Sequence, residues 1–367
     1  MKIGIFYVSA GHGHKKAAEA LKEAFLDTPY APDVELVDVV ERGSALLQKT
    51  YVQTYQTLAV HFPWVWSFFF CLSNSKILSP LVNVARAMFN TFHLKRFSSW
   101  VRTQSFDLCV STHFMPAYKL GKMKQNGQIQ TKLVTVVTDY RVHRFWVNSG
   151  TDAYTTMTEE ARQDILSIDS KARVAVLGIP ISSKFSKSYD RSKTRLKLGL
   201  SDSDLTLLIT TGSFGSGPLL QILEKLDDLS GLQTMVVCAQ NETLYNTLKS
   251  ESFKNRVLIL GYVSNMEELM AASDAAIVKP GGLTLCEGLA QNVVLILTSP
   301  IPGQEEGNRH ILLSRHAAYS LDQLETLPEI IRQIKTQASS YLEVKRQAAQ
   351  LRKPQASRDI VTWITTL

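Results

Sequence analysis

The sequence predicts an α/β protein with two Rossmann-like domains that face each other across a cleft. Residues 3–8 and 205–211 are apolar runs typical of buried parallel strands, and each is followed by a glycine-rich loop and a helical pattern. Short apolar runs then alternate with helical stretches through both halves of the chain. With 367 residues, the chain is long enough for two such domains.

The composition is that of a folded globular protein, with 45% hydrophobic and 20% charged residues. No apolar segment reaches the roughly 18 residues that a spanning helix needs, and the N-terminus enters a strand directly. We therefore expect neither a transmembrane segment nor a signal peptide. The four cysteines are widely spaced, without a CxxC pair, which favours free thiols in a reducing, cytoplasmic compartment over disulfides or zinc.

The net charge of +7 is concentrated in the first half of the chain. Between Lys76 and Lys124 there are eight basic residues and a single acid, Asp107. Such a segment favours an anionic partner, either nucleic acid or an anionic membrane leaflet, although charge alone fits a solvated surface equally well. The basic residues are not interleaved with aromatic ones as in known nucleic-acid modules, so we expect no nucleic-acid partner.

The strongest candidate for a binding site lies in residues 275–308. An apolar run ends at Lys279, and Gly281 and Gly282 follow it at the start of a helical pattern. Two glycines at a strand-to-helix junction let backbone N–H groups and the positive end of the helix dipole approach a phosphate. A Gly-Gly turn by itself is more often an ordinary loop, so the interpretation depends on its neighbours.

Side chains beyond the glycines complete this candidate site. Thr284 can donate a hydroxyl to the same anion, and Glu287, one turn later, can accept both hydroxyls of a ribose. The loop after the next apolar run carries Gln304, Glu305 and Asn308, and it should open on the same carboxyl edge of the sheet. Together these residues predict a socket for a nucleotide diphosphate that carries a polyhydroxylated group.

A second candidate is the loop of residues 9–14, which follows the first predicted strand and ends at His14. An imidazole at this position has a pKa range that suits a general base, although a single loop histidine more often has a surface or capping role. His12 and His14 lack a third metal ligand nearby. The loop is not GxGxxG, which argues against a nicotinamide cofactor.

Two further predicted strands end in polar residues. One leads to His113, and the other, residues 132–137, leads to Asp139. Both ends should point into the same cleft as His14. Asp139 can orient His14 or cap a turn, and Trp146 can line the cleft or serve in packing.

The run at residues 58–72, LAVHFPWVWSFFFCL, has few polar interruptions for a soluble amphipathic helix. Trp and Phe beside a basic segment are typical of an interfacial membrane anchor, so we interpret this run as membrane-binding, with a core helix as the alternative. The residues assigned to this surface are Pro63, Trp64, Trp66, Phe68 and Phe69.

These motifs together resemble one family. KPGG-T-CEGLA followed by P-PGQEEGN, the G-x-G-H loop and the run TDYRVHRFWV are similar to the monogalactosyldiacylglycerol synthase and processive diacylglycerol glucosyltransferase group of glycosyltransferase family 28. The resemblance covers nearly the whole chain. It implies the GT-B architecture, with acceptor and membrane binding in the first domain and UDP-sugar binding in the second.

The resemblance also implies roles for residues. His14 is implied as the base that activates the acceptor, with Asp139 as a second catalytic candidate, and His113, His143 and Trp146 as acceptor-side or cleft-lining groups. The donor-binding residues are Gly13, Ser213, Gly261, Met266, Lys279, Gly281, Gly282, Thr284, Glu287, Gln304, Glu305 and Asn308.

The predicted reaction is inverting transfer of glucose or galactose from a UDP-sugar to diacylglycerol, without a metal or other cofactor. The protein would bind peripherally to the anionic surface of the membrane, on the cytoplasmic face of the cell membrane. The alternatives are transfer of N-acetylglucosamine to an undecaprenyl-linked peptidoglycan precursor, a UDP-sugar epimerase, and a non-catalytic membrane-associated nucleotide-sugar binding protein. The sequence leaves open the hexose, processivity, the acyl preference and the oligomeric state.

The predicted boundaries are residues 1–181 for the acceptor domain and 201–340 for the UDP-sugar domain. The polar, basic residues 182–200 are predicted to be a linker. Residues 341–367 are predicted to form a C-terminal helix that returns to the first domain.

Overall fold

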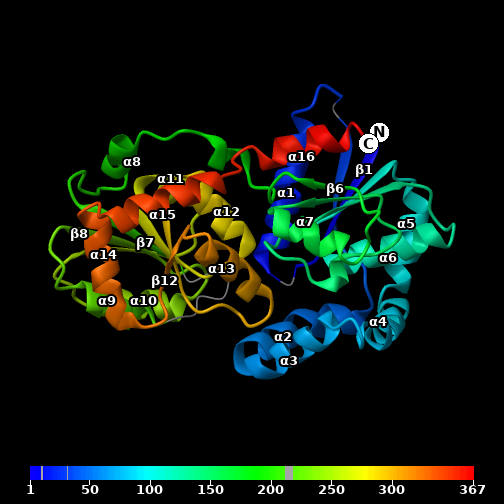
Figure 1. Ribbon diagram of the computed structural model, residues 1–367, viewed down its shortest axis with the longest axis horizontal. Coiled ribbons are helices and arrows are strands. Elements are labelled where there is room, and N and C mark those ends of the chain that lie inside the picture. The colour runs from blue at the N-terminus through cyan, green and yellow to red at the C-terminus, as the bar shows by residue number, and fades with distance from the viewer. Residues whose placement is uncertain (10, 31, 211–217) are drawn as a thin grey trace. The chain divides into compact units, whose positions relative to one another are not determined.

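The computed structural model divides into two compact units (Figure 1). It describes residues 1–9, 11–30, 32–210 and 218–367. The first unit comprises Met1–Ser183, Ile301–Asn308 and Gln355–Leu367. The second comprises Lys184–Pro300 and Arg309–Pro354.

The first unit is built on a six-stranded parallel sheet with the order β2-β1-β3-β4-β5-β6. Its strands are β1 (Lys2–Tyr7), β2 (Asp33–Asp38), β3 (Leu108–Ser111), β4 (Lys132–Val136), β5 (Ala153–Thr156) and β6 (Val174–Val176). Its helices are α1 (His12–Leu26), α2 (Ala45–His61), α3 (Pro63–Asn74), α4 (Ser79–His93), α5 (Lys95–Gln104), α6 (Phe114–Gln125), η1 (Arg144–Trp146), α7 (Glu159–Leu166) and α16 (Ala356–Ile364).

Both faces of this sheet are covered, as the apolar strands require. Ile5 of β1 belongs to a buried cluster with Leu21 of α1 and Ile360 of α16. The next residue, Phe6, belongs to the cluster on the opposite face, where its ring packs edge-on against Phe97 of α5. Successive side chains of a strand point to opposite faces, so an uninterrupted apolar strand is stable only between two layers of helices.

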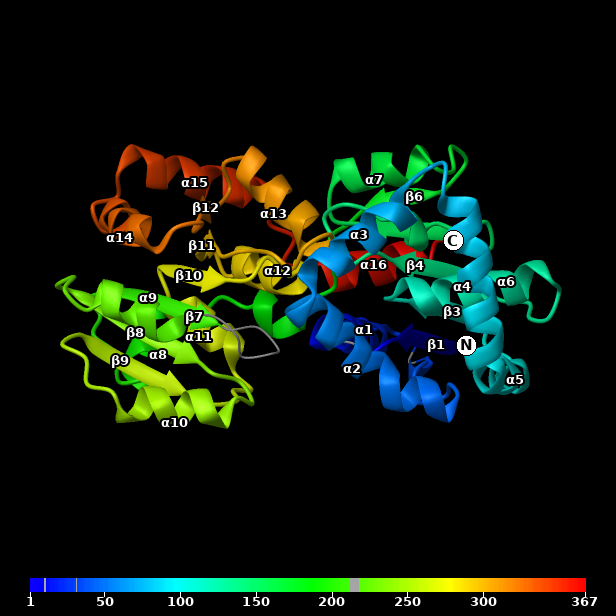
Figure 2. The same ribbon diagram turned by 90° about the horizontal axis from the view of Figure 1, so that it is seen from below.

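The second unit repeats this plan with the order β12-β11-β10-β7-β8-β9, which Figure 2 shows from β9 to β12. Its strands are β7 (Leu205–Thr210), β8 (Leu232–Val237), β9 (Arg256–Leu260), β10 (Ala275–Val278), β11 (Val294–Leu297) and β12 (Tyr319–Ser320). Its helices are α8 (Arg191–Lys197), α9 (Leu219–Leu226), α10 (Glu242–Ser250), α11 (Met266–Ala272), α12 (Gly282–Ala290), η3 (Leu324–Thr326), α14 (Leu327–Lys335) and α15 (Ser339–Gln350). Two helices, η2 (Ser183–Ser186) and α13 (Gln304–Ser314), begin in the first unit and end in the second.

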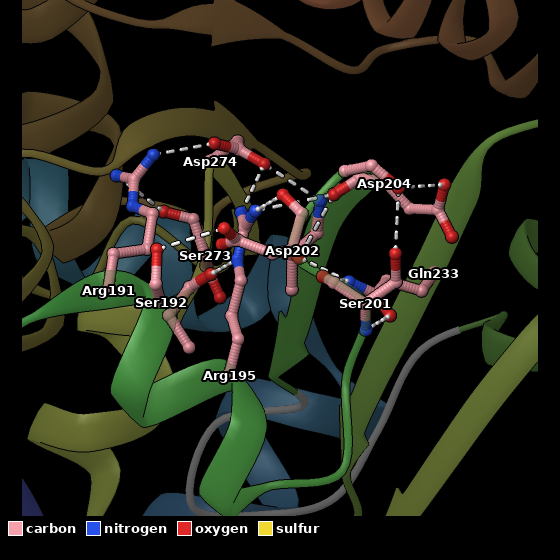
Figure 3. Close-up of polar contacts among 12 residues, drawn as sticks. Arg191, Ser192, Arg195, Ser201, Asp202, Asp204, Gln233, Ser273 and Asp274 are labelled. Atoms are coloured by element: carbon pink, nitrogen blue, oxygen red, sulfur yellow. Dashed lines mark hydrogen bonds and ion pairs between the residues drawn. The ribbon is translucent and has the colours of Figure 1, made fainter.

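The structure differs from the predicted linker at residues 182–200. Helix α8 lies in this segment and belongs to the second unit, because two of its arginines are ion-paired with Asp274 (Figure 3). Arg195 is buried and also donates to the carbonyl oxygens of Ala272 and Asp202. A basic composition suggests a solvated linker, but Arg191 and Arg195 are four residues apart and therefore share one face of the helix.

The predicted C-terminal helix is two helices. Pro354 separates α15 from α16, since proline has no N–H to donate and disfavours helical backbone at the residue before it. Helix α15 packs in the second unit, where Tyr341 and Val344 join its core, and the return to the first unit begins at Gln355. The segment Ile301–Asn308 also groups with the first unit, whereas the predicted boundary at residue 340 placed it in the second.

Helices α2, α3 and α4 follow one another between β2 and α5 (Figures 1 and 2). Phe62 separates α2 from α3, and Pro63 occupies the first turn of α3, where a missing N–H costs nothing. Among the described residues, no helix combines the length and the hydropathy that crossing a bilayer requires.

Candidate functional site

In the first unit, the candidate residues gather where β1 and β3 end. The strand order reverses direction between these two neighbours, and ligands of parallel α/β sheets bind outside the carboxyl ends at such a point. The turn after β1 leads into α1, and Thr112 and His113 follow β3 directly.

His14 lies in the first turn of α1 and not in the loop where the sequence placed it, because the helix begins at His12. Its Nδ1 is 2.8 Å from the carbonyl oxygen of Thr112 and 3.1 Å from the hydroxyl of Thr138. A carbonyl oxygen only accepts, so we assign the proton to Nδ1, which leaves the lone pair on Nε2. Burial lowers the pKa of His14 to about 4, against a smaller opposing effect of the Thr112 hydrogen bond.

The rings around His14 are aromatic and buried. His113 packs edge-on against His14 with 4.6 Å between ring centroids, and Trp146 is 6.2 Å away. His113 caps α6, since its Nδ1 accepts from the N–H of Met115. Burial lowers the pKa of His113 well below its usual value, and the charges of His14 and Arg86 act in the same direction. An apolar, uncharged surface therefore borders the imidazole of His14.

Asp139 connects the end of β4 to the segment Ile301–Asn308. Its carboxylate accepts from the amide of Gln304 at 3.5 Å, from the side chain of Asn308 and from the indole N–H of Trp146. Burial raises the pKa of Asp139 to about 7, although these hydrogen bonds oppose the rise. The two predicted catalytic residues thus have separate partners: Thr112 and Thr138 hold His14.

Asn308, predicted to contact the sugar, is buried inside the first unit. Its Oδ1 accepts from the backbone N–H of Tyr140 at 2.7 Å. Glu305 accepts from the N–H of Ile301 at 2.7 Å, and Gln304 and Glu305 are both half-buried. The amide of Asn308 therefore joins the segment to the end of β4, while its two neighbours lie closer to solvent.

His143 links α3 to η1. Its Nδ1 accepts from the N–H of Phe145, and its Nε2 lies 3.2 Å from the carbonyl oxygen of Phe70 and 3.1 Å from the hydroxyl of Ser73. Burial lowers the pKa of His143 to about 4. The neutral ring is thus bonded on both sides within the first unit, which favours a structural function over the acceptor-side position expected from the sequence.

The aromatic run has one exposed side. Trp64, Phe68 and Phe69 are 74%, 60% and 56% exposed, whereas Pro63 and Trp66 are half-buried. Helix α4 adds exposed apolar side chains at helical spacing, which are Leu81, Val84, Met88, Phe89 and Phe92. A surface of this kind on consecutive helices is typical of an interaction site.

Arg86, counted in the basic segment, does not contribute to the surface as the sequence suggested. Its guanidinium donates to the carbonyl oxygens of Phe114 and Phe145, at 2.9 and 3.0 Å, and stacks on Tyr118 with 4.1 Å to the ring centroid. Burial lowers its pKa to about 10, so it stays charged. Arg86 therefore fastens α4 to α6 and η1.

In the second unit, the predicted donor loop lies at the carboxyl end of β10. The strand order reverses between β10 and β7, so this is the equivalent position in the second sheet. Gly281 caps the nine-residue helix α12 in an extended conformation, without a side-chain cap. Among the described residues, no side chain caps the first N–H groups of α12, as an anion site at a helix N-terminus requires.

The other residues predicted to bind the donor in this loop lie on or beside α12. Lys279 and Thr284 are half-buried, and Glu287 is buried one turn beyond the glycines. Gly288 allows close packing on β11, since an added Cβ would lie 2.7 Å from Leu295. Gly261 follows β9 directly and Met266 opens α11, both half-buried. Gly13 is the second residue of α1 in the first unit, and Ser213 lies outside the described residues.

An Asp-x-Asp sequence occurs at residues 202–204, at the amino end of β7 and hence at the edge opposite the donor loop. The carboxylate of Asp202 accepts from Ser192 (Figure 3). Within the part of the chain that the structure describes, no group of three or more His, Cys, Asp or Glu is arranged to hold a metal ion.

Thr112 and Thr138 belong to the two polar strand ends that the sequence predicts to point into the same cleft as His14. No function was assigned to them from the sequence, and their contacts with the His14 ring come from the structure.

Each half of the chain matches a known protein family. Residues 14–181 match the family described as monogalactosyldiacylglycerol (MGDG) synthase. Residues 206–360 match the glycosyltransferase family 28 C-terminal domain.

The chain is similar to two proteins named processive diacylglycerol beta-glucosyltransferase. The one from Bacillus licheniformis is 30% identical over 274 residues, which cover 74% of this chain and 71% of the relative. The one from Staphylococcus aureus strain Newman is 26% identical over 320 residues, which cover 84% and 78%.

The fold is similar to that of a solved structure described as an S. aureus MnaA–UDP co-structure, with a TM-score of 0.63, 14% identity and coverage of 99% of this chain and 96% of that one. This likeness concerns the fold, which is the GT-B architecture of two Rossmann-like domains. The two family matches and the Bacillus licheniformis relative show that the chain belongs to the monogalactosyldiacylglycerol synthase and processive diacylglycerol beta-glucosyltransferase group of glycosyltransferase family 28.

Proposed function

We propose that this protein transfers glucose or galactose from a UDP-sugar to the hydroxyl of diacylglycerol, with inversion at the anomeric carbon. The family supports both substrates. The observation that carries the mechanism is the neutral imidazole of His14, whose Nδ1 is engaged by Thr112 and whose Nε2 keeps its lone pair. The oxygen of the acceptor hydroxyl attacks the anomeric carbon while Nε2 takes the hydroxyl proton. The bond between the anomeric carbon and the UDP oxygen breaks at the same time.

UDP leaves with a negative charge, and the donor loop stabilises it. The N–H groups at the start of α12, the hydroxyl of Thr284 and the ammonium of Lys279 supply positive potential. Glu287 binds the ribose hydroxyls, with Gly261 and Met266 beside the base.

Gln304 and Glu305 bind the hexose hydroxyls in this proposal. Asn308 has a positioning function instead, because its amide is buried and bonded to Tyr140. Asp139 accepts from Gln304 and Asn308, so it orients these amides and does not act directly as a base.

The transfer requires no metal or other cofactor in this proposal. The positive end of α12 and Lys279 supply the charge that a metal ion would otherwise bring to the diphosphate. The Asp-x-Asp sequence lies at the opposite edge of the sheet, which supports this view.

The protein acts at the cytoplasmic face of the cell membrane as a peripheral protein, without a nucleic-acid partner. Trp64, Phe68 and Phe69 insert at the headgroup level, and exposed basic residues such as Lys76 and Arg96 attract anionic lipids. The apolar stripe of α4 extends this surface.

The test is transfer of radiolabel from UDP-glucose, and separately from UDP-galactose, to diacylglycerol in anionic liposomes with EDTA present. Labelled glycolipid from one donor establishes the reaction, the hexose and metal independence together, and a ladder of products shows processive addition. Activity that EDTA abolishes and Mg²⁺ restores contradicts the metal-free mechanism. No product from either donor, with UDP binding intact, points to a different lipid acceptor.

A further inference from the structure

Helix α3 and the turn before α13 are in direct contact within the first unit. A Cβ added to Gly303 would lie 2.7 Å from Cγ of Phe70 and 2.8 Å from Cδ1. Gly303 also has a φ of +86°, in the region that favours glycine. Both the conformation and the close approach of the ring therefore require glycine at this position.

Phe70 has a fixed position for a second reason. Its carbonyl oxygen lies 3.2 Å from Nε2 of His143, and its ring is 4.4 Å from the imidazole, centroid to centroid. The hydroxyl of Ser73 donates to the same carbonyl oxygen at 2.9 Å. His143 is itself bonded to the backbone of Phe145, so the ring of Phe70 is anchored to η1 as well as to its own helix.

The turn at Gly303 leads directly into the residues proposed to bind the hexose. Gly303 donates its N–H to Glu306 at 2.9 Å, and Ile301 donates its N–H to Glu305 at 2.7 Å. Gln304 is the first residue of α13. A displacement of the turn therefore displaces both Gln304 and Glu305.

We propose that Phe70 is a positioning residue for the donor sugar: its ring supports the turn at Gly303 and thereby sets where Gln304 and Glu305 present their polar groups. This inference rests on the proposed function, which takes these two side chains as hexose contacts. Helix α3 then has two functions, since Trp64, Phe68 and Phe69 face solvent while Phe70 supports the donor-binding turn.

The experiment compares Phe70→Ala, Phe70→Leu and Cys71→Ala. Cys71 is the exposed neighbour of Phe70 on the same helix, which makes it a matched control. Three quantities are measured for the full-length protein: kcat and KM for the UDP-sugar, sedimentation with anionic liposomes, and amide hydrogen exchange of residues 301–308.

Phe70→Ala should raise KM for the UDP-sugar by about tenfold and accelerate exchange in residues 301–308, with liposome binding retained. Phe70→Leu, which restores much of the volume, should recover most of the affinity, and Cys71→Ala should resemble the wild type. Gly303→Ala disturbs the same contact from the loop side and should also raise KM, so the inference stays testable if Phe70→Ala does not fold.

Wild-type KM and exchange in both Phe70→Ala and Gly303→Ala would overturn the inference. So would a clear loss of liposome binding in Phe70→Ala relative to Cys71→Ala, because Phe70 would then belong to the membrane surface. If the wild type transfers no hexose, the proposed function fails, and hydrogen exchange alone decides whether Phe70 supports the turn.

Discussion

The predicted donor loop of the second unit relies on backbone groups, whereas the candidate site of the first unit depends on side chains whose pKa values are set by burial. In the second unit, Gly281 and Gly282 follow β10, and the helix that they open supplies the N–H groups. In the first unit, burial lowers the pKa of His14 to about 4 and raises that of Asp139 to about 7. The predicted anion site thus depends on a local motif, whereas the acid–base chemistry proposed for His14 depends on its tertiary environment.

The largest effect is expected for His14→Ala. Turnover should fall by about a hundredfold to ten-thousandfold through loss of the general base, while the Kd for the UDP-sugar stays within about twofold. Single-turnover transfer and calorimetric titration measure the two quantities. Near-normal turnover would exclude His14 as the general base, and the first unit would then have no buried side chain assigned to acid–base chemistry.

Replacing Trp64, Phe68 and Phe69 together by Ser should weaken liposome binding by about a hundredfold, from roughly 3 kcal/mol of lost apolar burial. Thermal unfolding should be unchanged, because all three rings are exposed. Trp66 and Phe70 stay in place because both are half-buried. A variant that fails to fold would identify the segment as core.

Glu287→Gln tests the second unit alone. The amide keeps the shape of the side chain but loses its charge, so the Kd for UDP should rise by about tenfold, as for one charge-assisted hydrogen bond. Thr284→Ser, which keeps the hydroxyl, serves as the control. An unchanged Kd in Glu287→Gln would exclude this carboxylate from ribose binding.

The smallest effect is expected from the titration of Asp139, which should make KM for the UDP-sugar change a few-fold with pH. Below a pH of about 7 the carboxyl is protonated and accepts the amide of Gln304 less well, so KM should rise as pH falls. His14, with a pKa of about 4, stays neutral over this range and contributes no such change. In Asp139→Asn, KM should not vary between pH 6 and 8; an inflection that persists there would assign it to another group.

Both parallel sheets and the donor loop could be predicted from the sequence, because buried strands and glycine turns leave local patterns. Strand β5 was missed, since its sequence AYTT lacks the apolar run typical of such strands. The linker prediction was wrong because the local sequence does not show a distant partner: Arg191 and Arg195 pair with Asp274, about eighty residues away.

The sequence by itself determined the family and the α/β plan, and it predicted His14, Glu287 and the glycines as site residues, since these depend on residue types at short spacing. The tertiary structure decided what the side chains do. In the folded chain, Nδ1 of His14 is bonded to the carbonyl oxygen of Thr112, and Asn308 is buried and bonded to Tyr140. Helix α3 has one exposed face, while its residue Phe70 contacts Gly303. Each of these contacts joins residues far apart in the chain, and burial, which sets hydrogen-bond partners and pKa values, is a property of the packed fold alone.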